Sequence, residues 1–418
     1  MAFVFGVVAD DFTGATDLAS FFRKRGLRVL QLIGRPDRPA SDFADDYDVL
    51  VVALKSRTIP PAEAVTVSLD ALDWLREGGC DRYYFKYCST FDSTERGNIG
   101  PVAEAMLNAL DERLTIFCPA LPVMGRTVYK STLFVGDVRL DESSMKDHPL
   151  TPMRDANLAR LLEPQVSGNI GKLDHSVVRR GGTAIRRELA DLRAQGVRFV
   201  IADAIDDDDL RALGDGARDL RLITGGSGLA IGVLVDPVGS APRDIDVGES
   251  DRAVIIAGSS SAMTNRQVEE GMKHFPHYRI SALDIASGRN VTDEALAWAD
   301  ANANEPTMLF YATAVPSEVK QVQEKLGVDV AGKMVEDTLA AIAAGVVERG
   351  VRTVVVAGGE TSGAVVKSLG VTALEIGEDL APGVPWTSAI GSKWPIRLAL
   401  KSGNFGGPEL FLEARGIQ

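Results

Sequence analysis

Two adjacent aspartates, Asp10 and Asp11, stand where the sequence changes from strand-like to helical spacing. The run Phe3–Ala9 is almost entirely apolar, as in a buried strand, whereas the apolar residues of 15–22 recur at helical intervals. Turns of this kind bind ligands in open α/β sheets, because free backbone N–H groups and the helix dipole attract anions there. One side-chain oxygen is enough to cap a helix. The pair therefore predicts a catalytic or metal-binding site, with simple capping by Asp11 or Thr13 as the alternative.

A second group of polar side chains follows the next strand-like runs, Val49–Leu54 and Tyr83–Tyr87. They carry guanidinium, ammonium, hydroxyl and carboxylate groups: Arg57, Lys86, Ser89 and Asp92. Because the carboxyl ends of parallel strands meet at one edge of a sheet, these groups should converge with the aspartate pair. Such a pocket suits a small hydroxylated acid, since arginine binds a carboxylate in bidentate fashion and acids accept hydrogen bonds from hydroxyls. The structural alternatives are a surface charge for Arg57 and an N-cap for Asp92.

The second half of the chain carries three glycine- and serine-rich turns. One follows the buried run Val354–Ala357 and covers 358–363, and the others are Gly258–Ser261 and Lys401–Gly407. Glycine lets a backbone approach a phosphate closely, and hydroxyls at a helix N-terminus add donors. None of the three matches the P-loop pattern, and the dinucleotide fingerprint is missing as well. Three such turns in one half nevertheless predict a nucleotide site.

The rhythm of the chain is that of an α/β protein, and its length favours two domains. Further strand-like runs are expected at 114–118, 199–202, 221–224, 253–257 and 308–311, with helical patterns at 62–74, 102–108 and 184–194. Each domain should hold a mostly parallel sheet flanked by helices, with the active site in the cleft between the domains. The stretch Pro122–Pro152 is rich in Gly, Pro, Asp and Ser, which predicts a long functional loop or lid. The best linker is Asp236–Asp246, so the expected domains are 1–247 and 248–418.

Composition narrows the function classes. The 418 residues carry a net charge of −13, which disfavours nucleic acid as a partner. No apolar run approaches the length that crosses a bilayer, and the first residues lack the pattern of a signal peptide. Three cysteines at unrelated spacings indicate reduced thiols, and the four histidines, among which His148 is of most interest, have no metal-site spacing. A cytoplasmic protein without a membrane partner is expected, with a homodimer as one expected assembly.

These motifs together resemble the four-carbon acid sugar kinase family. The resemblance runs from residue 4 to about 413 and is carried by five segments: Ala9–Ala15, Asn98–Gly100, Gly225–Ala230, Gly358–Ser362 and Gly383–Trp386. Within the family, Tyr87–Thr94 is similar to the 3-oxo-tetronate kinase branch. The segments Gly125–Tyr129 and His148–Met153 are similar to that branch too. Threonate and erythronate kinases usually show a Lys-x-Asp-Ser-Thr-Leu-Arg-Gly type of sequence where this chain has Tyr87–Thr94, so the ligand of the substrate carboxylate stays open.

The resemblance implies that the first domain binds the acid sugar and the second binds ATP with Mg²⁺. Matching motifs place the nucleotide on Ser259, Gly358, Gly359, Glu360, Thr361, Ser362 and Gly403. The acid sugar is expected on Asp10, Thr13, Arg57, Lys86, Ser89, Asp92 and Asn98. The expected reaction is in-line transfer of the γ-phosphoryl group to a primary hydroxyl, with Asp11 or Asp10 as the proton acceptor. The product would be 3-oxo-tetronate 4-phosphate, which a partner enzyme decarboxylates.

Three other functions are weighed against this one. A D-threonate or erythronate 4-kinase belongs to the same family. A sugar-acid sensor without catalysis would use the basic pocket alone, and the three glycine-rich turns speak against it. A nicotinamide-dependent oxidoreductase is disfavoured because the dinucleotide fingerprint is missing.

Overall fold

The structure is a computed structural model, and it describes residues 5–43, 46–147, 151–234, 252–314 and 327–417. Its internal contacts divide the chain into two units, Met1–Pro242 and Arg243–Gln418, each with its own set of strands. The predicted linker Asp236–Asp246 and the predicted boundary at 247/248 lie outside the described residues, as does His148. The predicted domain limits and the predicted site between the domains therefore stay predictions.

Unit 1 is built on a parallel sheet with the strand order β2-β3-β1-β4-β11-β5-β10-β9. The strands are β1 (Phe5–Ala9), β2 (Val29–Ile33), β3 (Val49–Ala53), β4 (Tyr83–Lys86), β5 (Thr115–Cys118), β9 (Asn169–Leu173), β10 (Val197–Ala202) and β11 (Leu222–Gly225). Strand β1 is buried along its whole length, as expected for a strand covered on both faces. Its last residue, Ala9, stands opposite Ala53 and Lys86. The segments after β1, β3 and β4 therefore leave the sheet at the same edge.

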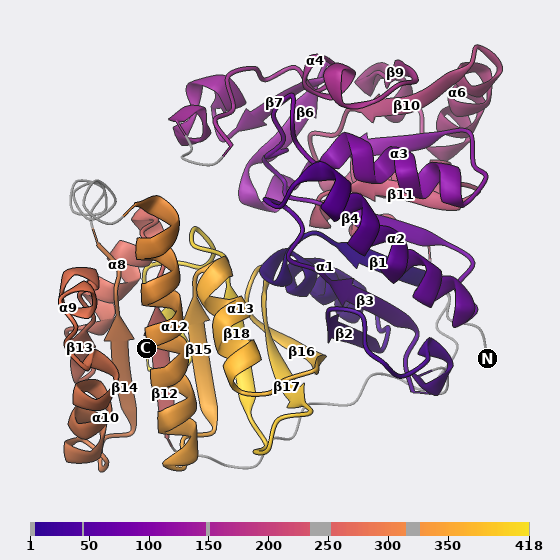
Figure 1. Ribbon diagram of the computed structural model, residues 1–418. Helices are drawn as coiled ribbons and strands as arrows, with labels where there is room; N and C mark the ends of the chain where they lie inside the picture. The colour runs from indigo at the N-terminus through magenta and orange to yellow at the C-terminus, as the bar shows by residue number, and fades with distance from the viewer. Residues whose placement is uncertain (1–4, 44–45, 148–150, 235–251, 315–326, 418) are drawn as a thin grey trace. The chain divides into compact units, whose positions relative to one another are not determined.

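The helices of unit 1 begin at residues suited to a helix start. They are α1 (Phe12–Lys24), α2 (Pro61–Glu77), α3 (Ile99–Ala109), α4 (Leu158–Leu162), α5 (His175–Val178), α6 (Gly182–Ala194) and α7 (Asp207–Gly216). Asp11 and Asp206 cap α1 and α7 with their carboxylates, and Pro61 is the first residue of α2, where its missing N–H costs nothing. Figure 1 shows α2 and α3 on one side of the sheet, and the two helices contact each other.

The prediction of a long irregular loop at Pro122–Pro152 is wrong for its first half. Residues 126–139 form a small antiparallel sheet of β6 (Arg126–Tyr129), β7 (Thr132–Val135) and β8 (Val138–Arg139). The turn between β6 and β7 has positive φ at both central residues, Lys130 (54°) and Ser131 (59°). Such a turn matches the right-handed twist of two paired strands. The segment after β8 continues in 3₁₀ turns as far as Asp147.

Unit 2 has the strand order β13-β14-β12-β15-β18-β17-β16, parallel up to β18 and antiparallel beyond it. Its strands are β12 (Ala253–Ala257), β13 (His277–Arg279), β14 (Thr307–Tyr311), β15 (Thr353–Ala357), β16 (Ala373–Ala381), β17 (Val384–Ile390) and β18 (Arg397–Lys401). Its helices are α8 (Ala262–Gly271), α9 (Ala282–Ala286), α10 (Val291–Ala301), α12 (Val328–Glu348), α13 (Gly359–Ser368) and α14 (Leu410–Glu413). The predicted α/β class with mostly parallel sheets is confirmed.

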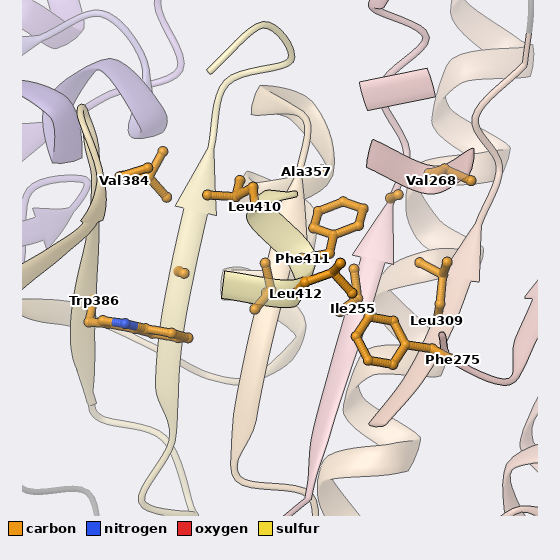
Figure 2. Packing of buried hydrophobic residues seen from close by; sticks show 14 residues of the cluster. Ile255, Val268, Phe275, Leu309, Ala357, Val384, Trp386, Leu410, Phe411 and Leu412 are labelled. Carbon is orange, nitrogen blue, oxygen red and sulfur yellow. The ribbon is translucent and has the colours of Figure 1, made fainter. Parts of the chain in front are cut away.

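The core of unit 2 fixes the strands that carry the glycine-rich turns. Figure 2 shows Phe411 of the short helix α14 beside Ile255 of β12, with Phe275 and Leu309 next to them. Ile255 and Leu309 are completely buried. Helices α12 and α13 pack against each other and run along the sheet in Figure 1. Within the described part of the chain, no helix combines the length and the apolar character that a membrane crossing requires.

Candidate active site

The aspartate pair of unit 1 lies in the turn between β1 and α1, as the sequence predicts. Asp11 is the N-cap of α1: its carboxylate accepts a hydrogen bond from the Gly14 N–H at 3.2 Å and from the Thr13 hydroxyl at 2.9 Å. The capping alternative is therefore correct for Asp11. Capping does not account for both aspartates, because both carboxylates also bind Arg57.

Arg57 joins the two carboxylates. Its Nε and Nη2 atoms each donate to Asp10 at 2.8 Å, and Nη2 also donates to Asp11 at 2.5 Å. The Asp10 side chain is only 6% exposed, compared with 21% for Asp11. Arg57 is therefore a partner of the acids, and its alternative as a surface charge is excluded. A charge-assisted bidentate pair of this kind has a fixed geometry.

The two carboxylates differ in acidity because their surroundings differ. Burial raises the pKa of Asp10, although Arg57 acts against it. Burial would also raise the pKa of Asp11, but Arg57 and Lys86 together hold it below the ordinary value. Burial opposes the charge on Arg57, yet the two carboxylates raise its pKa well above that of a free guanidinium. Asp11 is thus the more acidic and the more accessible member of the pair.

Lys86, at the end of β4, and Asn98, at the start of α3, also contact the segments that form this cluster. A Cβ atom on Gly14 would lie 2.7 Å from Lys86 Nζ and 2.3 Å from Asp11 Oδ1, so only glycine leaves room for both side chains. Lys86 Nζ also donates to the Tyr87 carbonyl at 2.8 Å. The Asn98 amide donates to three carbonyls of the loop 56–59, at 2.7 to 3.1 Å, and so fixes the segment that carries Arg57.

The segment after β4 brings Asp92 to the same edge. Its backbone N–H donates to Cys88 Sγ at 3.0 Å, and burial raises the pKa of this thiol to about 12. Asp92, Arg57 and Asp10 all act electrostatically on Cys88, so Asp92 shares this thiol with the aspartate–arginine cluster as a common neighbour. Asp92 is not the N-cap of α3, because Asn98 holds that position. Ser89 is half-buried in the turn between Cys88 and Asp92.

In unit 2 the three glycine-rich turns converge, because β12, β15 and β18 are neighbours in the sheet. A Cβ atom on Gly258 would lie 2.2 Å from Thr361 Oγ1, and one on Gly403 would lie 2.5 Å from Ser259 Oγ. Gly358 has φ of +126°, a conformation that side chains rarely adopt. Glycine is therefore required at these positions by close approach and by backbone geometry.

The third turn, Lys401–Gly407, is held by hydrogen bonds to the carbonyl of Gly403. The Gly403 carbonyl accepts hydrogen bonds from Ser261 Oγ at 2.6 Å, Thr264 Oγ1 at 2.8 Å and Lys401 Nζ at 2.8 Å. Lys401 is completely buried, and this burial lowers its pKa to about 7. The Lys401 amine contacts the turn through the Gly403 carbonyl. In its protonated form it adds a positive charge to the backbone N–H groups, which favour an anion at this edge of the sheet.

A cavity of about 840 Å³ opens at these turns. Of the predicted nucleotide residues, Ser259, Gly358, Gly359, Glu360 and Thr361 line it. The other two do not: Ser362 is buried in α13, and Gly403 lies next to the Ser259 side chain but outside the cavity lining. The volume lies within the range of small-molecule and cofactor sites.

The sequence does not predict the rest of the cavity lining. This part includes the segment Arg279–Asp284 at the end of β13, Ala312 and Ala314 after β14, and Ala331, Gly332, Val335 and Glu336 on α12. One sequence signal was available, because Ser281 accepts from the Asp284 N–H at 3.3 Å and begins α9 with a Ser-x-x-Asp spacing. The Ser-x-x-Asp spacing alone did not indicate a site, because β13 before it has only three residues and cannot be recognised as a strand in the sequence.

Two family models match the chain. The model described as a sugar-binding N-terminal domain covers residues 5–233, and the one described as a nucleotide-binding C-terminal domain covers residues 254–411. Curated relatives include the 3-oxo-tetronate kinase of Cupriavidus necator, 53% identical, and that of Burkholderia multivorans, 52% identical. Each alignment covers 98% of this chain and 96% of the relative.

Solved structures of similar proteins have the same fold. A Haemophilus influenzae protein of the DUF1537 family is 43% identical, with a TM-score of 0.77 over 98% of this chain and 99% of its own. A Salmonella typhimurium protein, provisionally described as a tRNA synthase, is 40% identical, with a TM-score of 0.84 over 99% of both chains. The full-length matches to both domain models and to the curated kinases agree with the motifs. The chain belongs to the four-carbon acid sugar kinase family and, within it, to the 3-oxo-tetronate kinase branch.

Proposed function

We propose that this protein is an ATP-dependent kinase that phosphorylates the C4 hydroxyl of 3-oxo-tetronate. The observation that carries the proposal is that one chain holds both clusters such a reaction needs. Unit 1 has carboxylates and cations at one sheet edge, and unit 2 has three phosphate-type turns on neighbouring strands, two of which line a cavity. The curated relatives with this full-length pattern are 3-oxo-tetronate kinases. They favour a kinase over a sensor that binds the acid without converting it.

In the proposed reaction, the acid sugar lies at the edge formed after β1, β3 and β4. Asp11 accepts the proton of the attacking hydroxyl, since it is ionised and the more accessible of the two aspartates. Asp10 and Arg57 hold Asp11 in place through their shared hydrogen bonds. Lys86 adds a positive charge close to the reacting groups, where it stabilises the transferring phosphoryl group. The roles of Thr13, Ser89, Asp92 and Asn98 toward the sugar stay predictions.

In the same proposal ATP binds in the cavity of unit 2, with its phosphates against the turns at Ser259 and Gly358–Thr361. Carboxylate oxygens suit Mg²⁺, which needs only one or two of them when it is held mainly by nucleotide phosphates. Glu360 in the first turn of α13 and Glu336 of α12 line the cavity and fit this requirement. The metal would supply neutralisation of phosphate charge.

The direct test is release of ADP from MgATP in the presence of freshly prepared 3-oxo-tetronate, with detection of the phosphorylated product. D-threonate and D-erythronate serve as alternative acceptors. The expected result is a kcat/KM for 3-oxo-tetronate that exceeds both alternatives by at least about tenfold, a difference of about 1.4 kcal/mol in transition-state binding. A preference for either tetronate would assign the chain to the other activity of the family. No transfer to any of the three acids would contradict the proposal.

We expect Gly359→Val to weaken ATP binding at least tenfold, by more than about 1.4 kcal/mol. Gly359 is the first residue of α13 and lines the cavity, so a branched side chain would stand where the phosphates approach. The required positive φ belongs to Gly358 and not to Gly359, so the substitution tests obstruction and not backbone strain. Calorimetric titration with ATP measures the effect.

The control for this variant is Ala301→Val, at the exposed end of α10, which adds similar bulk away from the cavity. It should bind ATP as the unsubstituted protein does. An unchanged ATP affinity in folded Gly359→Val protein would remove this turn from the nucleotide site.

A further inference from the structure

Arg126 reaches the same sheet edge of unit 1 from the small antiparallel sheet. It is the first residue of β6, and its backbone forms two hydrogen bonds with Leu121, at 2.8 and 3.0 Å. Leu121 comes three residues after the end of β5. Position 126 is therefore anchored beside a carboxyl end of the parallel sheet and not on the outer part of the small sheet.

The guanidinium of Arg126 is incompletely hydrogen-bonded. Its Nη1 atom donates to the Met124 carbonyl at 2.6 Å, whereas its Nε atom is buried and has no hydrogen-bond partner among the described residues. Burial lowers the pKa of Arg126, and the groups whose charges act on it are Asp17, Asp92 and Cys88. Two of these groups, Cys88 and Asp92, belong to the segment after β4. Arg126 therefore lies within electrostatic range of the segment after β4, which carries Asp92 at this edge of the sheet.

Asp92 has a buried acceptor atom without a hydrogen-bond donor among the described residues. Its Oδ1 atom is buried and accepts no hydrogen bond within the described part of the chain. Buried polar atoms are nearly always paired in native proteins, because an unmade hydrogen bond costs about 1–3 kcal/mol. Here an unpaired donor and an unpaired acceptor belong to two side chains at the same edge of the sheet, and the charge of Asp92 acts on Arg126. A ligand that offers an anionic acceptor and a hydroxyl donor would satisfy both, and a hydroxylated acid has these two groups.

Two other cations of the edge, Arg57 and Lys86, are already engaged. Arg57 uses the Nε/Nη2 edge of its guanidinium for Asp10, and Nη2 also donates to Asp11, so this edge is occupied by the aspartate pair. Lys86 is directed to the Tyr87 carbonyl and lies beside Asp11. Arg126 differs from both, because a planar edge with a buried donor remains. A guanidinium edge matches a carboxylate with two parallel hydrogen bonds.

We propose that Arg126 binds the carboxylate of the acid sugar and that Asp92 accepts a hydrogen bond from a sugar hydroxyl. This inference rests on the proposed function and makes it more specific. It names the residue that distinguishes an acid from a neutral sugar. The segment Tyr87–Thr94 departs from the threonate-kinase pattern, which left the ligand of the substrate carboxylate open. Arg126 would be that ligand. Arg126 thus sets specificity, whereas the aspartate pair acts on the reacting hydroxyl.

The test compares two acceptors in protein with and without the guanidinium. One acceptor is 3-oxo-tetronate, and the other is erythrulose, the ketose that carries a CH₂OH group in place of the carboxylate. In Arg126→Met, kcat/KM for the acid should fall about 10- to 100-fold, the loss expected for hydrogen bonds to a charged group. The value for erythrulose should stay within about threefold, so the preference for the acid collapses. Arg126→Lys, which keeps a charge without the planar edge, should lose less.

Arg139→Met is the matched control, since Arg139 belongs to β8 of the same small sheet and is 45% exposed. It should keep the preference for the acid. An equal fall for both acceptors in Arg126→Met, or an unchanged preference, would overturn the assignment while phosphoryl transfer by the unsubstituted protein still supports the kinase.

A second readout does not depend on turnover. Calorimetric titration with the stable acid D-erythronate, without nucleotide, should show binding that Arg126→Met weakens at least tenfold and Arg139→Met leaves unchanged. ATP affinity should be the same in all three proteins. If the unsubstituted protein fails to phosphorylate any acid, the kinase proposal fails. The titration then still decides whether Arg126 is an acid-binding residue, and equal binding in all three proteins, or none, would reject it.

Discussion

Replacement of Asp11 by Asn should lower kcat by about 10²–10⁴-fold, the range typical for loss of a general base. The amide keeps the size of the side chain and an oxygen that can still accept from the Gly14 N–H, so the N-cap of α1 is retained. It removes the proton acceptor. Steady-state kinetics with 3-oxo-tetronate and MgATP measure the effect, and ATP affinity should be nearly unchanged because the nucleotide turns belong to unit 2.

The matched variant is Asp10→Asn. Asp10 forms the two-bond pair with Arg57, so this change should mainly raise the KM for the acid sugar by disturbing the position of Arg57 and Asp11. The opposite result, with the large fall in kcat at Asp10, would exchange the two roles. Near-normal kcat in both variants would make the pair structural. The base would then have to be sought at Asp92 or at Asp137, which is exposed in the turn between β7 and β8.

The pH dependence separates the two aspartates independently. A base must be ionised, so kcat/KM falls when the pH drops through its pKa in the free enzyme. Asp11 has a pKa below its ordinary value of about 3.9, so it produces no loss of activity above about pH 5. Asp10 has a raised pKa, so a base at this position would bring the acid-side loss to higher pH. We expect the first profile in the unsubstituted protein.

The sequence is sufficient to place a strand and the turn after it where the strand is fully buried and the spacing of apolar residues changes clearly from strand to helix. β12 and β15 lie at the predicted residues, and β1 ends at Ala9 as predicted, because fully buried parallel strands appear as uninterrupted apolar runs. The turns after these strands were therefore placed correctly. With them the sequence predicts the convergence of Asp10, Asp11, Arg57 and Lys86, because all four stand at the carboxyl ends of predicted parallel strands.

The small antiparallel sheet could not be found in this way. Its strands have two to four residues, and the turn at Lys130 and Ser131 uses positive φ without the Asn-Gly signature of such turns. Composition then favoured a loop. As a result Arg126 was noted only as part of a branch-specific segment, and its position at the sheet edge is known from the structure alone. The cavity wall at Arg279–Asp284 was missed for a similar reason, since the strand before it is short.

Replacement of Arg57 by Met should destabilise unit 1 by about 3–5 kcal/mol at pH 7, the cost of removing one partner from a buried ion pair. Asp10 is 6% exposed and would keep its charge with no guanidinium to balance it. Chemical denaturation, followed by the midpoint of the transition, measures the loss. The control is Arg38→Met, whose pair with Asp42 at 3.3 Å is exposed and should contribute less than about 1 kcal/mol.

The loss in Arg57→Met should also shrink on acidification. Burial already raises the pKa of Asp10, and removal of Arg57 takes away the main influence that lowers it. The folded variant therefore holds a proton on Asp10 at pH values where the unfolded chain has released it. Its stability is then highest below the unfolded pKa of about 3.9 and decreases as the pH rises through the folded pKa. Chemical denaturation at pH 5 and at pH 7 measures the loss of stability in Arg57→Met at the two pH values. A loss that is equal at both values and no larger than that of Arg38→Met would mean that the pair does not stabilise this edge of the sheet.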